Sequence, residues 1–214
     1  ATIEFPLMYW NEFFTIAIAH LFAVASPGPD FAVVLKQCVT NGTRSGIWTS
    51  LGVAAAILLH VTYCILGVAL LLTQSPLLFL AVRYLAAIYL LYLGVAAIKE
   101  SMKIKSAEIE LSSTSVVKPV QAFYLGFLTN GLNPKATLFF LSLFTVVISP
   151  VTPTFVQASY GLYLAVATFA WFTMLSVVLG HEKFRSRILK LGIWFERIMG
   201  LILIFLAVQI VLFD

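Results

Sequence analysis

Charged residues are scarce in this chain of 214 residues, and acidic residues are fewer than basic ones. Only 10% of the residues are charged, with 9 Asp and Glu against 13 Lys and Arg, whereas 61% are hydrophobic. The mean hydropathy is +1.02. This composition excludes an ordinary soluble domain and predicts a membrane protein. The net charge of +4 does not call for a nucleic-acid partner, because a basic membrane-facing surface explains it.

Cysteine is almost absent, and the residue groups of an intramembrane enzyme are absent too. Cys38 and Cys64 lack metal-site spacing, so we interpret both as packing residues and expect neither a metal nor another cofactor. An aspartyl membrane protease needs two facing carboxylates, and we count Asp30 as the only acid inside a span. Ser26 with His60 is too weak a pairing to indicate a serine enzyme. The sequence therefore predicts a protein without catalytic residues.

The apolar residues form six long segments. Each segment reaches about the 20 residues that a helix needs to cross a bilayer core, and the ten-residue alternation of a transmembrane β-barrel is missing. The N-terminal stretch ATIEFPLMYWNEFF, in which the first segment begins, has no Lys or Arg, so we expect this segment to be retained as a span. We predict an all-α polytopic membrane protein with six transmembrane helices. They cover 10–35, 46–72, 77–98, 121–148, 155–179 and 193–213.

Lys and Arg gather in the connections after the first, third and fifth segments. This bias predicts that these connections are cytoplasmic and that both termini lie on the opposite, periplasmic side. The residues concerned are Lys36, Arg44, Lys99, Lys103, Lys105, Lys118, Lys183, Arg185, Arg187, Lys190 and Arg197. The stretch 99–120 is polar enough to be a cytoplasmic linker loop.

Helix-breaking residues interrupt two of the segments, SPGPDF in the first and NGLNPK in the fourth. Aligning Pro29 with Pro134 places Asp30 on Lys135, and an apolar run follows each pair. Proline removes an amide donor and blocks the preceding turn, so each break leaves backbone groups without intrahelical partners. Such backbone is tolerated at membrane depth only where protein, water or a ligand satisfies it.

The matched breaks predict two repeats of three spans, residues 1–98 and 121–214, joined by the loop 99–120. Because three is odd, the repeats cross the membrane in opposite senses, and helices one and four are the broken ones. In secondary transporters with such inverted repeats, the broken helices meet near mid-membrane and form the substrate site. Small residues at 52–56 and 86–87 allow close helix contacts, either within the chain or in a homodimer.

The two breaks carry the charges that an amino-acid zwitterion requires. Lys135 and the amides after Pro134 suit a carboxylate, whereas Asp30 and freed carbonyls around Gly28 and Pro29 suit an ammonium group. In the empty site Asp30 and Lys135 would neutralise each other. The alternative is that the prolines only kink the helices and that both charges lie at the membrane interface.

Four other residues are candidates for the same site. Asn130 and Asn133 either bind the substrate or cap the restarted helix. Trp171 either forms a wall, with a cation–π contact to an ammonium group, or only packs. Proton coupling needs a titratable group, and Asp30 and His60 are the candidates, although His60 is equally well explained by a bond to a backbone carbonyl. Tyr63 lies on the face of His60, three residues further on.

Four stretches resemble the lysine exporter superfamily, specifically its homoserine/threonine resistance branch. They are SPGPDF, HVTYCILGVALLL, RYLAAIYLLYLG and LTNGLNPKATLFF, and the resemblance runs over essentially the whole chain. It implies a bacterial inner-membrane exporter of a small amino acid, threonine- or homoserine-like or otherwise neutral, or of a derivative, coupled to protons as an antiporter. A passive channel for small polar solutes is the alternative, because it would share the broken helices but show no saturable, proton-linked flux.

Overall fold

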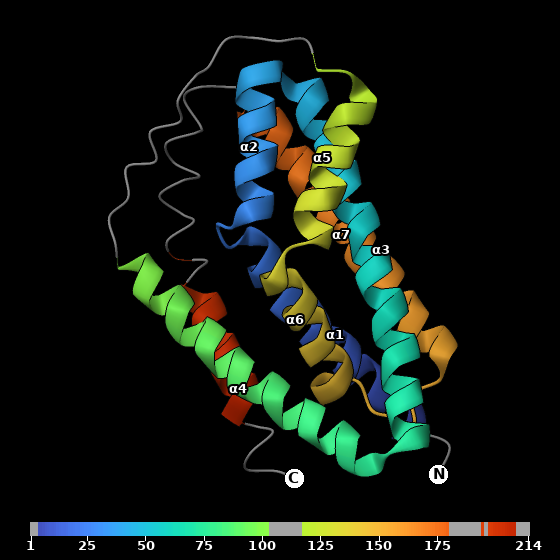
Figure 1. The fold of residues 1–214 in the computed structure, drawn as a ribbon. Helices are drawn as coiled ribbons and strands as arrows, with labels where there is room; N and C mark the ends of the chain where they lie inside the picture. Colours follow the sequence, from blue (N-terminus) through green and yellow to red (C-terminus); the bar gives the residue numbers. More distant parts are fainter. Residues whose placement is uncertain (1–3, 103–116, 180–193, 195–196, 209–214) are drawn as a thin grey trace.

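The computed structural model describes residues 4–102, 117–179, 194 and 197–208. Within these ranges every regular element is helical, as predicted (Figure 1). Three helices are long and apolar enough to cross a membrane by themselves: α3 (Thr43–Gln74), α4 (Pro76–Ser101) and α7 (Thr154–Leu179). A bent pair of helices makes a fourth candidate span. The number of six spans therefore stays a prediction, as does the division into domains.

The first predicted break separates α1 (Glu4–Ala25) from α2 (Pro29–Asn41), and the two helices meet at an angle of 51°. The backbone hydrogen bond that closes the last turn of α1 runs from the Ser26 N–H to the Phe22 carbonyl oxygen at 3.0 Å. Gly28 is the N-cap of α2 in an extended conformation, and Pro29 is its first residue. Proline suits this position because its missing N–H would have no helical partner there, so the chain restarts the helix at Pro29.

The second break separates α5 (Pro119–Gly131) from α6 (Pro134–Ser142). Asn133 is the N-cap of α6, and its side-chain oxygen accepts the Lys135 N–H at 3.0 Å. Capping of the restarted helix was one of the two hypotheses for Asn133. The α6 segment continues directly into a single π-helical turn, η1 (Leu143–Val147), before the chain turns into α7.

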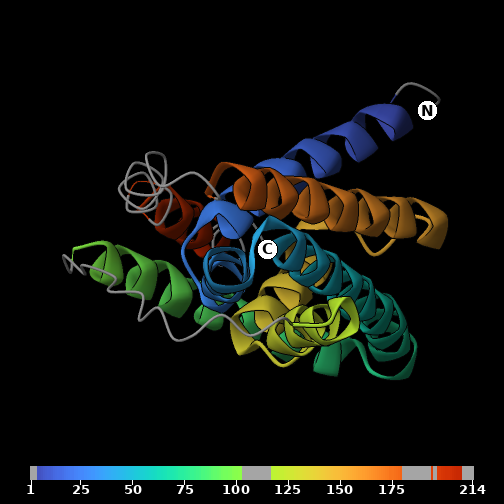
Figure 2. The ribbon, with the colours of Figure 1, turned by 90° about the horizontal axis from the view of Figure 1, so that it is seen from above.

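The two broken helices run in opposite directions. Figure 1 shows the chain rising through α1 and then α2, and descending through α5 and then α6. Seen from above, α1 and α7 lie side by side, and α4 lies beside the last helix, Arg197–Val208 (Figure 2). The helix α4 ends at Ser101 and α5 begins at Pro119, so the first and last residues of the predicted linker 99–120 are helical, and the linker itself stays a prediction. Residues 103–116 lie outside the described part.

Close glycine contacts join α3, α5 and α7. A Cβ atom added to Gly52 would lie 2.0 Å from the Phe123 carbonyl oxygen, and one added to Gly126 would lie 2.1 Å from that of Thr49. The helix α7 approaches α3 in the same way, because a Cβ on Gly161 would lie 2.4 Å from a Val61 methyl group. Only glycine allows backbones to come this close. These three helices therefore form a tightly packed scaffold. The close contact at Gly52 agrees with the prediction that the small residues at 52–56 allow close helix contacts.

Candidate functional site

The two breaks meet at one pocket, to which every α-helix of the described chain contributes. Its polar lining comes mostly from the breaks, and its remaining walls are apolar and rich in aromatic rings. The polar residues are His20, Ser26, Asp30, Asn130, Asn133, Lys135 and Thr168, and the aromatic ones are Phe31, Phe139, Phe140 and Phe172. A polar strip in an apolar cavity is the usual form of a small-molecule site.

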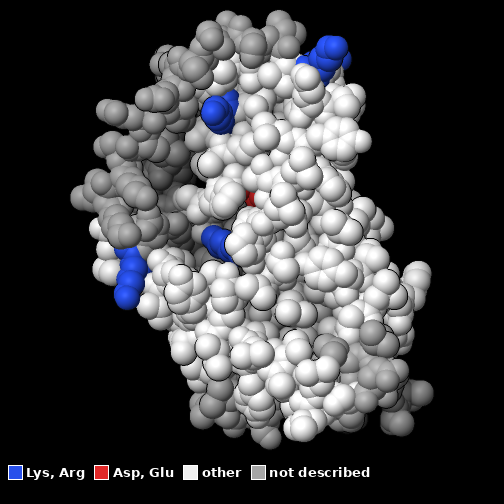
Figure 3. All heavy atoms as spheres, in the orientation of Figure 1, with Lys and Arg blue, Asp and Glu red and all other residues white. Residues whose placement is uncertain are grey.

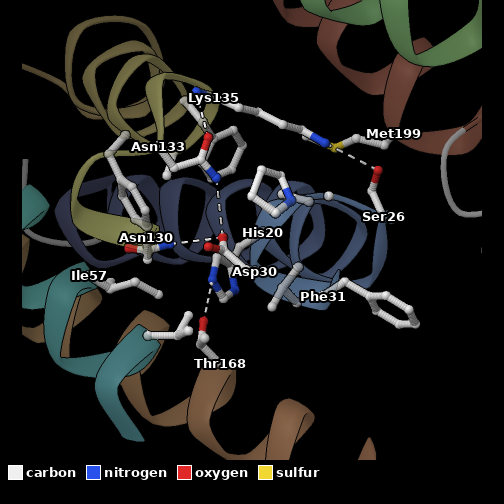
Figure 4. A pocket seen from close by; sticks show the side chains of 18 of the residues that line it. His20, Ser26, Asp30, Phe31, Ile57, Asn130, Asn133, Lys135, Thr168 and Met199 are labelled. Carbon is white, nitrogen blue, oxygen red and sulfur yellow. Dashed lines mark hydrogen bonds between the residues drawn. The ribbon is translucent and has the colours of Figure 1, made fainter. Parts of the chain in front are cut away.

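Asp30 lies in the first turn of α2 and is held by side chains from the other break. The Asn130 amide donates to Asp30 Oδ2 at 2.9 Å, and the Asn133 amide lies 3.5 Å from the same oxygen (Figure 4). The position also suits a carboxylate because the first turn of a helix carries partial positive charge. The structure thus brings Asp30, Asn130 and Asn133 together, as the matched breaks predict.

Lys135 makes the reciprocal contact. It belongs to the first turn of α6, and its ammonium group donates to the Ser26 hydroxyl at the end of α1 at 3.3 Å (Figure 4). Each charged residue at the start of a second half-helix therefore contacts the end of the first half-helix of the other pair. Ser26 is only 4% exposed. Sequence reasoning gave it no part in the binding site, although it stands beside the Pro-Gly-Pro stretch.

Two buried oxygen atoms in this polar strip have no hydrogen-bond partner within the described chain. They are Asp30 Oδ1 and Asn130 Oδ1. Buried polar atoms are nearly always paired, and an unpaired one carries a substantial desolvation cost. Both atoms are acceptors and both belong to residues that line the pocket. A bound group with N–H donors beside Asp30 would satisfy its free carboxylate oxygen.

The start of α2 offers a second kind of site. The N-cap residue Gly28 forms no side-chain cap, whereas Asn133 caps α6. An uncapped helix start leaves amide donors available to an anion. Gly28 is also close to the lysine: a Cβ added to it would lie 3.7 Å from Lys135 Nζ. The start of α2 therefore offers amide donors close to the Lys135 ammonium group, and the assignment of the anion site to the amides after Pro134 stays a prediction.

His60 is fully buried in α3 and does not line the pocket. Its Nε2 atom lies 3.1 Å from the backbone oxygen of Asn130, and its Nδ1 atom is hydrogen-bonded to the Tyr63 hydroxyl. Its ring also stacks on Phe140, which does line the pocket, with centroids 5.3 Å apart. His60 therefore makes the expected bond to a backbone carbonyl, and this bond connects it to the residue that holds Asp30, while its role in proton coupling stays a prediction.

The remaining candidate residues differ in whether they line the pocket. Pro29 lines it, whereas Pro134 starts α6 without lining it. Trp171 lies outside this pocket, in a separate groove between α1 and α7. His20 borders both the pocket and this groove, and its Nε2 atom is 3.0 Å from the Thr168 hydroxyl. No local sequence signal marks His20 as a pocket residue.

The described residues contain no group of three His, Cys, Asp or Glu side chains close enough to share a metal ion. Cys38 and Cys64 are both buried free thiols. Each belongs to an apolar cluster of the core, which agrees with their interpretation as packing residues.

Comparisons with known proteins agree with this picture. The chain is 26% identical over 190 residues to the threonine efflux protein of Escherichia coli strain K12, covering 88% of this chain and 91% of that protein. It is 30% identical over 208 residues to the leucine efflux protein of Klebsiella pneumoniae, covering 93% and 94%. It is 37% identical over 150 residues to that of Salmonella choleraesuis, covering 69% and 66%. No solved structure matches the chain.

A protein-family model described as LysE type translocator matches residues 21–213, which is nearly the whole chain and includes both breaks. The chain therefore belongs to the LysE type translocator family, and it is a multi-pass membrane transporter rather than an enzyme.

Proposed function

We propose that the protein exports a neutral amino acid, threonine- or homoserine-like or with another uncharged side chain, or a close derivative. Transport crosses a bacterial inner membrane in exchange for protons. The observation that carries this proposal is the pocket where the two breaks meet, with acceptors at one end of its polar strip and an ammonium group at the other. A zwitterion has the complementary order of charges.

The ammonium group of the substrate binds to Asp30. The Asp30 Oδ1 atom is buried without a partner in the described chain, and an ammonium group has three donors, one of which it offers to this oxygen. The amide groups of Asn130 and Asn133 keep the carboxylate of Asp30 in place while its other oxygen binds the substrate. A charge-assisted hydrogen bond in such a site is stronger than a neutral one.

The carboxylate of the substrate binds to Lys135 and the uncapped start of α2. Lys135 already donates to the Ser26 hydroxyl, and a carboxylate is a stronger acceptor for an ammonium group than a hydroxyl is. In the empty site Asp30 and Lys135 compensate each other's charge across the pocket, because an isolated charge at this depth would be costly.

Proton coupling is assigned to Asp30 and His60. Asp30 contacts the substrate directly, so it carries either the substrate or a proton. His60 is hydrogen-bonded to the backbone oxygen of Asn130, whose side-chain amide donates to Asp30. On its other side His60 is hydrogen-bonded to the Tyr63 hydroxyl, and Tyr63 is partly exposed. These contacts connect Asp30 with the protein surface. Histidine changes its charge in the physiological pH range with only small environmental shifts.

Two inverted repeats of three spans accommodate this site. The antiparallel broken helices, and helix restarts at the matched residues Pro29 and Pro134, support the repeat. Lys36, Arg44 and Lys118 lie near the end of α2 and the starts of α3 and α5, which share one end of the molecule (Figure 1). The lower third of the face in Figure 3 shows no charged group among its described atoms. We therefore propose that the end with these basic residues is cytoplasmic and that both termini are periplasmic.

The names of the relatives guide the choice of substrate. Those relatives are named as efflux proteins for threonine and leucine, both of which carry no side-chain charge. The pocket lining contains one carboxylate, Asp30, and one ammonium group, Lys135. The ammonium and carboxylate groups of a zwitterion pair with both of them. A charged side chain would then meet only apolar walls, at a large desolvation cost. We therefore propose threonine and leucine as the first substrates to assay.

Vesicles loaded with labelled threonine or leucine provide the test, with efflux measured with and without a pH gradient. Asp30→Asn and Lys135→Ala should each abolish saturable efflux, whereas Lys36→Ala, which removes an exposed lysine from α2, should leave it unchanged. Folded Asp30→Asn and Lys135→Ala proteins that export at the parental rate would refute the proposed site. Flux through the parent that never saturates and ignores the gradient would instead indicate the passive channel.

A further inference from the structure

A buried carboxylate that the proposed site does not use lies near the opposite end of α1. Glu12 is 6% exposed. Its Oε1 atom accepts the Ser149 N–H and the Thr152 hydroxyl, both at 2.8 Å, and the Tyr160 hydroxyl lies 3.2 Å from Oε2. Ser149 and Thr152 belong to the turn between η1 and α7, and Tyr160 belongs to α7. We call this group the Glu12 clasp, because one side chain of α1 binds two neighbouring segments.

Within the described residues, two contacts between polar side chains join α1 and α7 along the seam between them, next to a hydrogen bond from the Tyr160 hydroxyl to the Tyr9 backbone oxygen at 3.0 Å. The first of these contacts is the Glu12 clasp. The second is the His20–Thr168 bond, and both it and the Glu12–Tyr160 contact join residues 148 positions apart. The equal separation means that α1 and α7 run parallel, with the two contacts about two helical turns apart. Between them lie Ile16 on α1 and Leu164 on α7, both with no exposed surface. The seam is thus closed by apolar residues between two polar contacts.

The two sides of this seam are attached differently to the rest of the protein. α7 is fixed to α3 by the contact of Gly161 with Val61, directly beside Tyr160, and α3 is fixed to α5 by its own glycine contacts. On the other side, α1 ends at the bent break before Gly28. The seam between α1 and α7 also leaves a groove, whose lining includes small residues such as Ala17, Ala167 and Ala170. A helix that ends at a break can change its angle there, and its opening would separate Ile16 of α1 from the apolar core that it shares with Val61 and Leu164.

The seam also borders the pocket. His20 lines both the pocket and the groove, so its bond to Thr168 separates the two spaces. At its upper end α1 finishes at Ala25, directly before Ser26, which Lys135 contacts. A substrate carboxylate that takes Lys135 away from Ser26 would therefore release one attachment of α1. Opening of the seam would connect the pocket with the end of the molecule where the clasp lies.

We propose that the first half-helix, α1, is the outward gate of the translocator, which pivots at the Ser26–Gly28 break and is held shut by the Glu12 clasp. The clasp lies at the end opposite the basic residues of α2, α3 and α5, which is the periplasmic end in the orientation proposed above. This inference rests on the proposed export function, because a gate has a role only where a solute passes.

The first test measures how readily the seam opens. In a background with Cys38→Ser and Cys64→Ala, Ile16→Cys places a thiol at the buried seam, and a membrane-impermeant maleimide is added from outside. Adding Glu12→Gln, which keeps the shape but removes the charge, should raise the labelling rate about tenfold, the effect of losing one charge-assisted hydrogen bond. Thr15→Ala is the matched control, since the Thr15 hydroxyl bonds only within α1, to the Asn11 carbonyl. An unchanged labelling rate in the Glu12→Gln protein would overturn the gate.

The second test locks the seam. The rings of Phe13 and Tyr163 are in contact across it, with centroids 4.8 Å apart. In the same background, Phe13→Cys and Tyr163→Cys are joined with a short, reducible bis-methanethiosulfonate. Cross-linking should stop threonine or leucine efflux and leave its binding unchanged, and reduction should restore efflux. Cross-linked protein that exports as fast as the reduced protein would contradict the gate, whereas absence of export even in the reduced protein would instead count against the proposed function.

Discussion

Replacement of Asp30 by asparagine should weaken binding of the amino acid through one identified group, its ammonium. The asparagine has the shape of aspartate and keeps a carbonyl oxygen for the amides of Asn130 and Asn133. What it loses is the charged oxygen Oδ1, which is buried and has no partner within the described chain. A hydrogen bond between two charged groups is worth about 1.5–3 kcal/mol, so Asp30→Asn should raise Kd about 10- to 100-fold.

A thermodynamic cycle separates this contact from general damage to the pocket. Binding of the amino acid and of its desamino analogue, which keeps the carboxylate but lacks the ammonium, is measured by calorimetry on parent and Asp30→Asn protein. The substitution should cost about 1.5–3 kcal/mol with the amino acid and much less with the analogue, giving a coupling energy of that size. The same cycle with Lys135→Ala should give a coupling near zero. A coupling near zero for Asp30 would refute the assignment of the ammonium site.

Three further predictions follow from the packing and the polar contacts. Gly28→Ala keeps an extended backbone but adds a methyl group 3.7 Å from the lysine ammonium, so it should weaken amino-acid binding by roughly 1 kcal/mol without changing thermal stability. Gly52→Ala forces a methyl group to within 2.0 Å of a backbone oxygen of α5 and should lower stability by about 1–3 kcal/mol in detergent unfolding, whereas Gly67→Ala on the same helix meets nothing within 4 Å and should be neutral. His60→Gln should remove the pH-gradient dependence of efflux while calorimetric affinity at fixed pH stays unchanged; a gradient response equal to the parent's would exclude His60 from coupling.

The breaks could be predicted from the sequence because their cause is local. Proline and glycine fix backbone geometry and remove donors wherever they occur, so the restarts at Pro29 and Pro134 follow from the residues alone. The proximity of Asp30 to Asn130 follows once the two breaks are matched. The spacing of His60 and Tyr63 likewise indicates a shared helix face, and the structure shows them hydrogen-bonded.

Contacts that depend on the register between distant helices could not be predicted. Glu12 lies inside the first predicted segment, where Asp30 was counted as the only acid, and the fold buries it against α7. His20 and Thr168 meet for the same reason. Trp171 was a candidate wall of the site, but the rotation of α7 directs it to the groove beside α1. Nearly uniform apolar sequences give no periodic signal that fixes such a rotation.

The most direct test of the central claim is a distance between the bound amino acid and Asp30. Solid-state NMR on the membrane-embedded protein, with a ¹⁵N-labelled amino acid and ¹³C-labelled aspartate, measures the dipolar coupling between the ammonium nitrogen and the carboxylate carbon. The account predicts a coupling typical of direct hydrogen bonding, lost in Asp30→Asn. An amino acid that is demonstrably bound but shows no such coupling would contradict it.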